Sequence, residues 1–310
     1  MSRHVWLDYV KSIAIFLVVL FHSNAVTCKA TSPILAMGVP LFFVANGALV
    51  LKKEHDIYYF IKKLCKILFL MLFWGTISSL TAMLHRGEGF SVVIGLMYTL
   101  HLRFGYAHIF WFMATLFVLY CIFPIIQNSV KNKSVCLFLL VVSFVFSFQA
   151  FGYRVPTFEI PNVFAWWQGE CVFYSVAGYV LVSDLSFGEL FKEKNGVAQK
   201  WYENNSGLCA GVFHVLLFLA LYSAQQLMWV NIPFFARHTP SRVDDAVFVM
   251  YRSPFVMLTT IIVVYACKIV FQKEQKLIMI IGSNTLGIYV THCLFMGGFQ
   301  SVISLHNPIL

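Results

Sequence analysis

Three residues of the first apolar run, Asp8, Lys11 and His22, have types and a spacing that suit acid–base chemistry. At about 100° per residue, the eleven steps from Lys11 to His22 return a helix nearly to its starting direction, so both side chains share one face, and Asp8 lies about 40° from it. A histidine facing lipid would be costly, so this face is expected to point into a helical bundle, with His22 about 16 Å along the axis from Lys11. A catalytic histidine and a buried structural histidine bonded to a neighbouring helix both fit this spacing.

The composition predicts the kind of elements that must position these residues. Hydrophobic residues make up 60% of the 310-residue chain and charged residues only 11%, too few to cover a water-soluble surface. Apolar stretches long enough to span a bilayer recur at 10–28, 34–51, 59–84, 109–127, 134–152, 167–183, 208–229, 252–271 and 277–300. They are continuous rather than alternating, which argues against barrel strands. We predict an all-α, polytopic transmembrane bundle of about nine to ten helices, forming one integral-membrane domain over residues 1–310.

The distribution of basic residues predicts the sidedness of the chain. The positive-inside rule places the N-terminus and the lysine-rich segments 52–66, 131–133, 192–200 and 273–276 in the cytoplasm, with the loop 231–251 and Leu310 outside. This requires the short apolar segment 88–105 to form a re-entrant or interfacial helix, because a crossing there would invert everything after it. The net charge of +9 fits anionic lipid or a polyphosphate ligand, and we expect no nucleic-acid partner.

Several chemistries have no support in the sequence. The eight cysteines are scattered without a C-x-x-C pair, so neither a disulfide framework nor a metal site is expected. Phosphate-binding glycine loops, zinc-protease motifs and serine nucleophile elbows are absent from the sequence. We therefore expect no tightly bound cofactor.

Four further segments carry a resemblance to a known family. They are VPLFFVANGALVL (39–51), where Pro40 and Gly47 are expected to break an apolar helix, FIKKLCKI (60–67), AHIFWFMATLFVLYCIFP (107–124) and SNTLGIYVTH (283–292). Together with the Lys11 to His22 pattern they resemble the membrane-bound acyltransferase-3 family. Its members carry acyl groups from cytoplasmic acyl-CoA to envelope glycans and related acceptors. The resemblance runs in order from about residue 5 to residue 293.

The resemblance implies roles for particular residues. It makes His22, Lys11 and Asp8 the catalytic candidates. It makes Lys63 and Lys66, with the adjacent Lys62, candidates for binding the phosphates of the acyl-CoA donor, although lysines at a helix entry also fit plain positive-inside flanking. Many family members have arginine at the first two of these positions, and lysine lacks the planar fork of arginine. Candidates for substrate contact or for structure are Asn46, His108, Trp111, Glu170, Tyr289 and His292.

The resemblance also implies a reaction. The expected protein is a multi-pass O-acyltransferase of the bacterial inner membrane that moves an acetyl group from cytoplasmic acetyl-CoA to a hydroxyl of a surface polysaccharide, such as O-antigen, or its lipid-linked precursor. His22 would act as the general base or would itself carry the acyl group. A succinyl or other short acyl donor is an alternative within the same class. A secondary transporter or flippase-like carrier, with intramembrane Lys, His and Glu along its path, is the alternative from another class.

Overall fold

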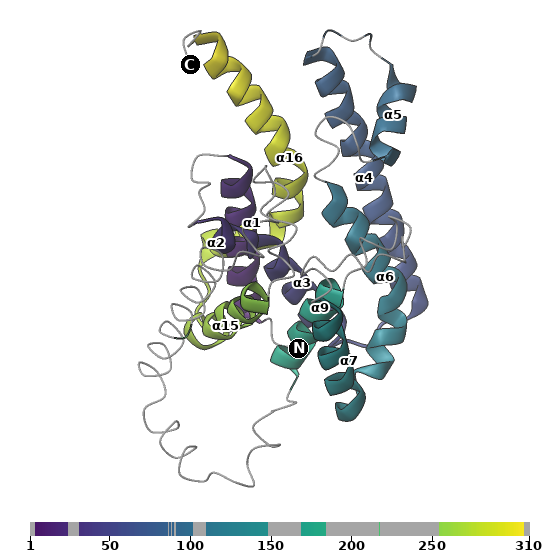
Figure 1. Ribbon diagram of the computed structural model, residues 1–310, viewed down its shortest axis with the longest axis vertical. Coiled ribbons are helices and arrows are strands. Elements are labelled where there is room, and N and C mark those ends of the chain that lie inside the picture. Colours follow the sequence, from purple (N-terminus) through teal and green to yellow (C-terminus); the bar gives the residue numbers. More distant parts are fainter. Residues whose placement is uncertain are drawn as a thin grey trace, which may run out of the picture.

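Helices make up all the regular structure in the described part of the chain. The computed structural model describes residues 4–23, 31–85, 91–101, 110–147, 169–183 and 254–306, and the single positions 87, 89 and 217. Within these residues there is no β-strand, which confirms the predicted all-α class there. The helices are α1 (Val5–His22), α2 (Ser32–Ala36), α3 (Gly38–Val50), α4 (Ile57–His85), α5 (Val92–His101), α6 (Trp111–Ser129), α7 (Lys133–Ser147), α9 (Gly169–Val182), α15 (Pro254–Val270) and α16 (Lys276–His306), as Figure 1 shows.

The described helices coincide with the predicted apolar stretches. Four segments among the described residues are long and apolar enough to cross a membrane, namely Val5–His22, Pro33–Val50, Ile57–Thr81 and Trp111–Ser129. The apolar parts of α7, α9 and α15 are shorter, with 10–17 residues against the about 20 that a span requires. The stretch 208–229 falls outside the described residues, apart from position 217, so the total of nine to ten helices stays a prediction.

Close helix packing forms the centre of the fold. α1 packs against both α16 and α3, and α3 packs against α9. The α3–α9 crossing depends on two glycines. A Cβ atom at Gly47 would lie 2.0 Å from the backbone oxygen of Ser175, and one at Gly178 would lie 2.0 Å from the oxygen of Val44. Small residues at such a crossing let two helix backbones approach in a membrane protein, where burial of apolar surface gives no advantage over lipid.

The second apolar stretch is interrupted at Met37, between α2 and α3, and not at Gly47 as predicted. α3 runs without interruption from Gly38 to Val50, through both Pro40 and Gly47. Pro40 lies in the first turn, where backbone N–H groups have no partner within the helix, so proline removes no helical hydrogen bond. Gly47 serves the contact with α9 instead of ending the helix.

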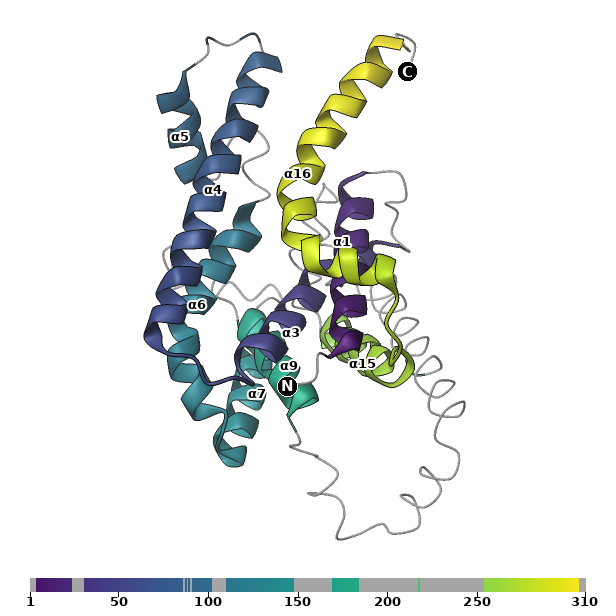
Figure 2. The same cartoon turned by 180° about the vertical axis from the view of Figure 1, so that it is seen from behind.

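The segment 88–105 contains one short helix. α5 has ten residues, about 15 Å of helix, which is half the thickness of the hydrocarbon core. α5 packs beside the C-terminal end of α4, and α6 packs beside the rest of α4 (Figures 1 and 2). Both run in the direction opposite to α4, so α5 does not return the chain across the bundle.

α16 bends where it passes α1. Its first part crosses α1, and its second part turns away toward the end of the bundle where α4 finishes and α5 begins (Figure 2). The Ser283 hydroxyl donates to the carbonyl of Met279 at 2.8 Å, and the Asn284 amide donates to that of Ile280 at 2.8 Å. Side chains that bond to the preceding turn compete with the helix's own hydrogen bonds and bend it.

Candidate active site

A cavity of about 200 Å³ lies between five helices of the bundle. α1, α3, α4, α6 and α16 each contribute to its wall. Three lysines line it, Lys11, Lys63 and Lys66, together with four neutral polar residues, Asn46, Tyr120, Thr285 and Tyr289. The rest of the wall is apolar, formed by Phe42, Ala45, Leu49, Ile67, Phe112, Met113, Leu116 and Leu286. The cavity therefore combines positive charge with an apolar lining, which suits an anionic ligand that has a long, less polar arm.

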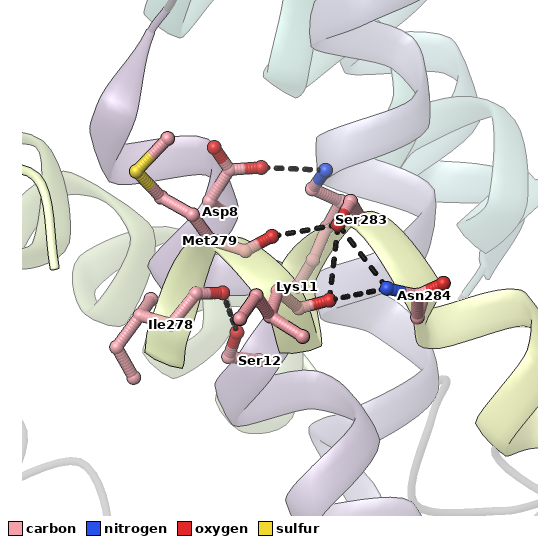
Figure 3. Close-up of polar contacts among 8 residues, drawn as sticks. Asp8, Lys11, Ser12, Ile278, Met279, Ser283 and Asn284 are labelled. Carbon is pink, nitrogen blue, oxygen red and sulfur yellow. Dashed lines mark hydrogen bonds and ion pairs between the residues drawn. The ribbon is translucent and has the colours of Figure 1, made fainter. Parts of the chain in front are cut away.

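The first lysine of the cavity is held by an ion pair within α1. Lys11 Nζ lies 2.8 Å from Oδ1 of Asp8, a carboxylate that is only 4% exposed (Figure 3). α16 approaches this turn closely, since a Cβ atom at Gly282 would lie 2.8 Å from the backbone oxygen of Asp8. The Ser12 hydroxyl donates to the carbonyl of Ile278 at 3.1 Å and ties the two helices together at the same level. Asp8 therefore directs the Lys11 ammonium while lying under α16.

The other two lysines come from one face of α4. Lys63 and Lys66 are three positions apart, which places them on the same side of a helix, and both line the cavity. Lys63 Nζ also lies 5.4 Å from the ring centroid of Tyr59. Lys62 points to the exposed side of α4 and does not line this cavity. The structure thus separates the three predicted donor-binding lysines into two that share the cavity and one that does not.

An amide and a phenol form a polar pair in the cavity wall. The Tyr120 hydroxyl donates to Oδ1 of Asn46 at 2.9 Å. Nδ2 of Asn46 is buried and has no hydrogen-bond partner among the described residues. This N–H group can donate to a carbonyl oxygen of a ligand. Asn46 was among the predicted candidates, and Tyr120 lies in the segment 107–124 on which the family resemblance rests.

His22 lies away from the lysine cavity, at the other end of α1, against a second histidine. Its Nδ1 atom is 2.9 Å from the carbonyl oxygen of Val18 and 3.3 Å from Nε2 of His292 on α16. Nδ1 of His292, which is 5% exposed, lies 2.6 Å from the carbonyl oxygen of Tyr289. The ring centroid of Tyr289 is 5.7 Å from that of His292, and Tyr289 also lines the cavity. Tyr289 therefore lies between the lysine cavity and the histidine pair.

The remaining predicted residues lie outside the cavity wall or outside the described residues. Trp111 is the first residue of α6, and its ring packs edge-on against that of Phe112. Glu170 is buried in the first turn of α9. Neither of the two lines the cavity. His108 lies outside the described residues.

A basic cluster that sequence reasoning missed lies at the end of the bundle where α9 finishes. Lys52 Nζ donates to the carbonyl of Val182 at 2.9 Å, and Lys268 Nζ donates to that of Leu181 at 2.5 Å. Cations are favourable at a helix C-terminus, where carbonyl groups lack partners. Nε2 of His4 lies 3.2 Å from Lys52 Nζ, and burial, with the charges of Lys52 and Lys268, lowers the pKa of His4 below its usual value. This cluster fastens the ends of α1, α3, α9 and α15 together.

The model of the acyltransferase-3 family, described as an acyltransferase domain, matches residues 4–310. No curated protein and no solved structure matches the chain.

Proposed function

Since the chain belongs to the acyltransferase-3 family, we propose that it is a membrane O-acetyltransferase that moves the acetyl group of acetyl-CoA to a hydroxyl of a surface polysaccharide, such as O-antigen, or of its lipid-linked precursor. Family membership and the apolar helices make it a membrane acyltransferase. The acetyl donor, the glycan acceptor and the bacterial inner membrane are part of the proposal.

The observation that carries the proposal is the arrangement of positive charge and histidine along α1. CoA has its phosphates at one end of a long pantetheine arm and its thioester at the other. A site for it needs cations at one place and a base at another. Lys11, Lys63 and Lys66 supply the cations at the cavity. His22 is eleven residues from Lys11 on the same helix, about 16 Å at a rise of 1.5 Å per residue.

The neutral donors of the cavity wall suit the arm of CoA. Nδ2 of Asn46 can donate to an amide carbonyl of pantetheine, and Tyr120 holds the amide in that orientation through Oδ1. Phe42, Phe112 and Leu116 provide an apolar surface for the methylene groups. The lysines then take the phosphates as charge-assisted hydrogen-bond donors.

In the proposed reaction the acceptor hydroxyl attacks the thioester carbonyl while His22 takes the hydroxyl proton. A C–O bond forms, the C–S bond breaks, and the proton passes from His22 to the departing thiolate, so the products are the acetyl ester and free CoA. In the alternative route His22 first attacks the thioester and carries the acetyl group, and the acceptor hydroxyl then removes it. Both routes need one unprotonated nitrogen on the imidazole.

The experiment that tests the proposal compares the envelope glycan of cells with and without the gene by mass spectrometry, and the CoA thiol released from acetyl-CoA by their membranes. We expect acetyl esters on the glycan and CoA release in the same proportion. His22→Ala should remove both while the protein still inserts at normal abundance. Movement of unmodified substrate without thioester consumption would instead identify a transporter, and succinyl esters would correct the donor.

The lysines of α4 provide a test of donor binding with a control on the same helix. Lys63→Ala and Lys66→Ala should each raise the KM for acetyl-CoA about tenfold or more, the effect of one lost charge-assisted hydrogen bond. Added salt should weaken donor binding least in the variants that lack these charges. Lys62→Ala removes the same charge outside the cavity and should leave KM nearly unchanged. An equal rise of the KM for acetyl-CoA in all three variants would show that these lysines act only through the general charge of the surface.

A further inference from the structure

His22 and His292 are brought together by two helices at opposite ends of the chain. α1 presents His22 in its last turn, and α16 presents His292 from its interior. Their ring centroids are 5.0 Å apart at 62°, and Nδ1 of His22 lies 3.3 Å from Nε2 of His292. The residues are 270 positions apart in sequence, so the contact is made only by the packing of α1 on α16.

The neighbouring carbonyl groups assign the protons on both rings. A carbonyl oxygen only accepts, so the 2.6 Å contact of His292 Nδ1 with the oxygen of Tyr289 requires a proton on that nitrogen. In the neutral ring Nε2 of His292 is then an acceptor. The 2.9 Å contact of His22 Nδ1 with the oxygen of Val18 requires a proton there as well. The single Nδ1–H of His22 therefore lies within reach of two acceptors, the Val18 oxygen at 2.9 Å and Nε2 of His292 at 3.3 Å, and Nε2 of His22 is the unprotonated nitrogen.

We propose that His292 is a positioning residue that holds His22 in the tautomer with Nε2 available to the reaction. The Val18 carbonyl also accepts the helical hydrogen bond of His22, so it is shared, and Nε2 of His292 is the second acceptor for the Nδ1–H of His22. This role rests on the proposed function of His22, and it applies equally to the general base and to the acyl carrier. His292 is to His22 what the aspartate is to the histidine of a serine-hydrolase triad.

A neutral acceptor suits the surroundings of this pair. His292 is 5% exposed, and a carboxylate in its place would have to be buried with its charge. When His22 gains a proton at Nε2, its Nδ1–H becomes a stronger donor, and Nε2 of His292 accepts from it without a second charge. Tyr289 orients His292 through its backbone carbonyl and reaches the cavity with its side chain. Tyr289 thus links the histidine pair to the lysine cavity, where we expect the acyl-CoA donor to bind.

Two substitutions of His292 separate the proposed contact from general polarity. Glutamine places its terminal oxygen near the position of imidazole Nε2, whereas asparagine reaches only as far as Nδ1. His292→Gln should therefore keep kcat within a few-fold of the native value, and His292→Asn and His292→Ala should lower it about tenfold or more. KM for acetyl-CoA should stay unchanged in all three. Equal losses in the Gln and Asn variants, at equal melting temperatures, would overturn the proposal.

A spectroscopic measurement tests the tautomer without reference to activity. In detergent-solubilised protein labelled with ¹⁵N-histidine, the His22 signals are identified by their loss in His22→Gln. We expect the proton on Nδ1 in the native protein and in His292→Gln, and a mixture of tautomers in His292→Asn. A native His22 with its proton on Nε2 would overturn the proposal even in an active enzyme. The expected tautomer in a protein that transfers no acetyl group would keep the pairing and reject the proposed function.

Discussion

Among single residues, Lys11 has a structural and a proposed functional role that can be separated. Its ion pair with Asp8 is partly buried, so Lys11→Ala should destabilise the protein, by less than the about 3–5 kcal/mol that breaking a fully buried pair costs. Lys11→Arg should keep both stability and donor binding, because it keeps the charge. The double substitution Lys11→Met with Asp8→Asn should recover melting temperature in detergent without recovering the KM for acetyl-CoA. Recovery of both the melting temperature and the KM would show that the ion pair has only a structural role.

His4 gives the fold a dependence on pH whose sign follows from its lowered pKa. Folding disfavours its protonated form, so the unfolded chain binds more protons as pH falls from the ordinary pKa of 6.5 toward the lowered folded value. The stabilisation present above pH 6.5 is therefore lost progressively through that window. We expect the melting temperature of the native protein to fall more steeply between pH 7 and pH 5 than that of His4→Gln, whose side chain still accepts from Lys52. Parallel curves would contradict this assignment.

Sequence reasoning reached some of these residues and could not reach others. Lys62 lies about 40° from Lys66 around the helix, so periodicity alone did not separate it from the other two lysines. That Lys63 and Lys66 share one helix face, by contrast, was within reach, because they are about 60° apart. The pairing of His22 with His292 was not, because periodicity reports the face of a residue and says nothing of which distant helix covers that face. The same holds for Tyr120, whose partner Asn46 lies on another helix.

At the level of helices, the α3–α9 crossing should be the contact least tolerant of substitution. Gly47→Ala and Gly178→Ala each put a methyl group 2.0 Å from a backbone oxygen of the facing helix, so the helices must separate. Gly287→Ala on α16 is the matched control, since among the described residues no atom outside its own helix backbone lies within 4 Å of the added Cβ, and alanine favours the helix. We expect the first two variants to lose folded protein on size-exclusion chromatography and the third to melt at or above the native temperature. A native-like Gly178→Ala would contradict the close approach.

The helices themselves were predictable and their packing was not. Continuous apolar runs fixed where α1, α4 and α6 lie, because a membrane requires hydrogen-bonded helices in such runs. Gly47 was misinterpreted, because a sequence does not tell a glycine that ends a helix from one that lets another helix approach. The bend of α16 likewise depends on Ser283 and Asn284 bonding to their own helix, which their residue types permit without requiring it.

For the whole molecule, the contacts define two ends of the bundle, and the charge pattern predicts which side of the membrane each faces. Lys52 contacts both His4 and the end of α9, and Lys131 pairs with Glu54, so these segments share one basic end. The end of α4, the start of α5 and the C-terminal end of α16 lie at the other end (Figures 1 and 2). The positive-inside rule then predicts that the basic end faces the cytoplasm, where the lysine cavity would be within reach of the proposed donor, cytoplasmic acetyl-CoA.

Reporter fusions after Glu54, Gly89, Lys131 and Leu310 test this sidedness. Green fluorescent protein should be bright after Glu54 and Lys131 and dark after Gly89 and Leu310, and alkaline phosphatase should show the opposite pattern. Glu54 and Lys131 form an ion pair, so they must report the same side whichever way the bundle inserts. Opposite signals from these two fusions would require 88–105 to cross the membrane, and would contradict the position of α5 and α6 along α4. If every signal is reversed instead, the fold stands but the lysine cavity opens away from the cytoplasm, and acetyl-CoA can no longer be its ligand.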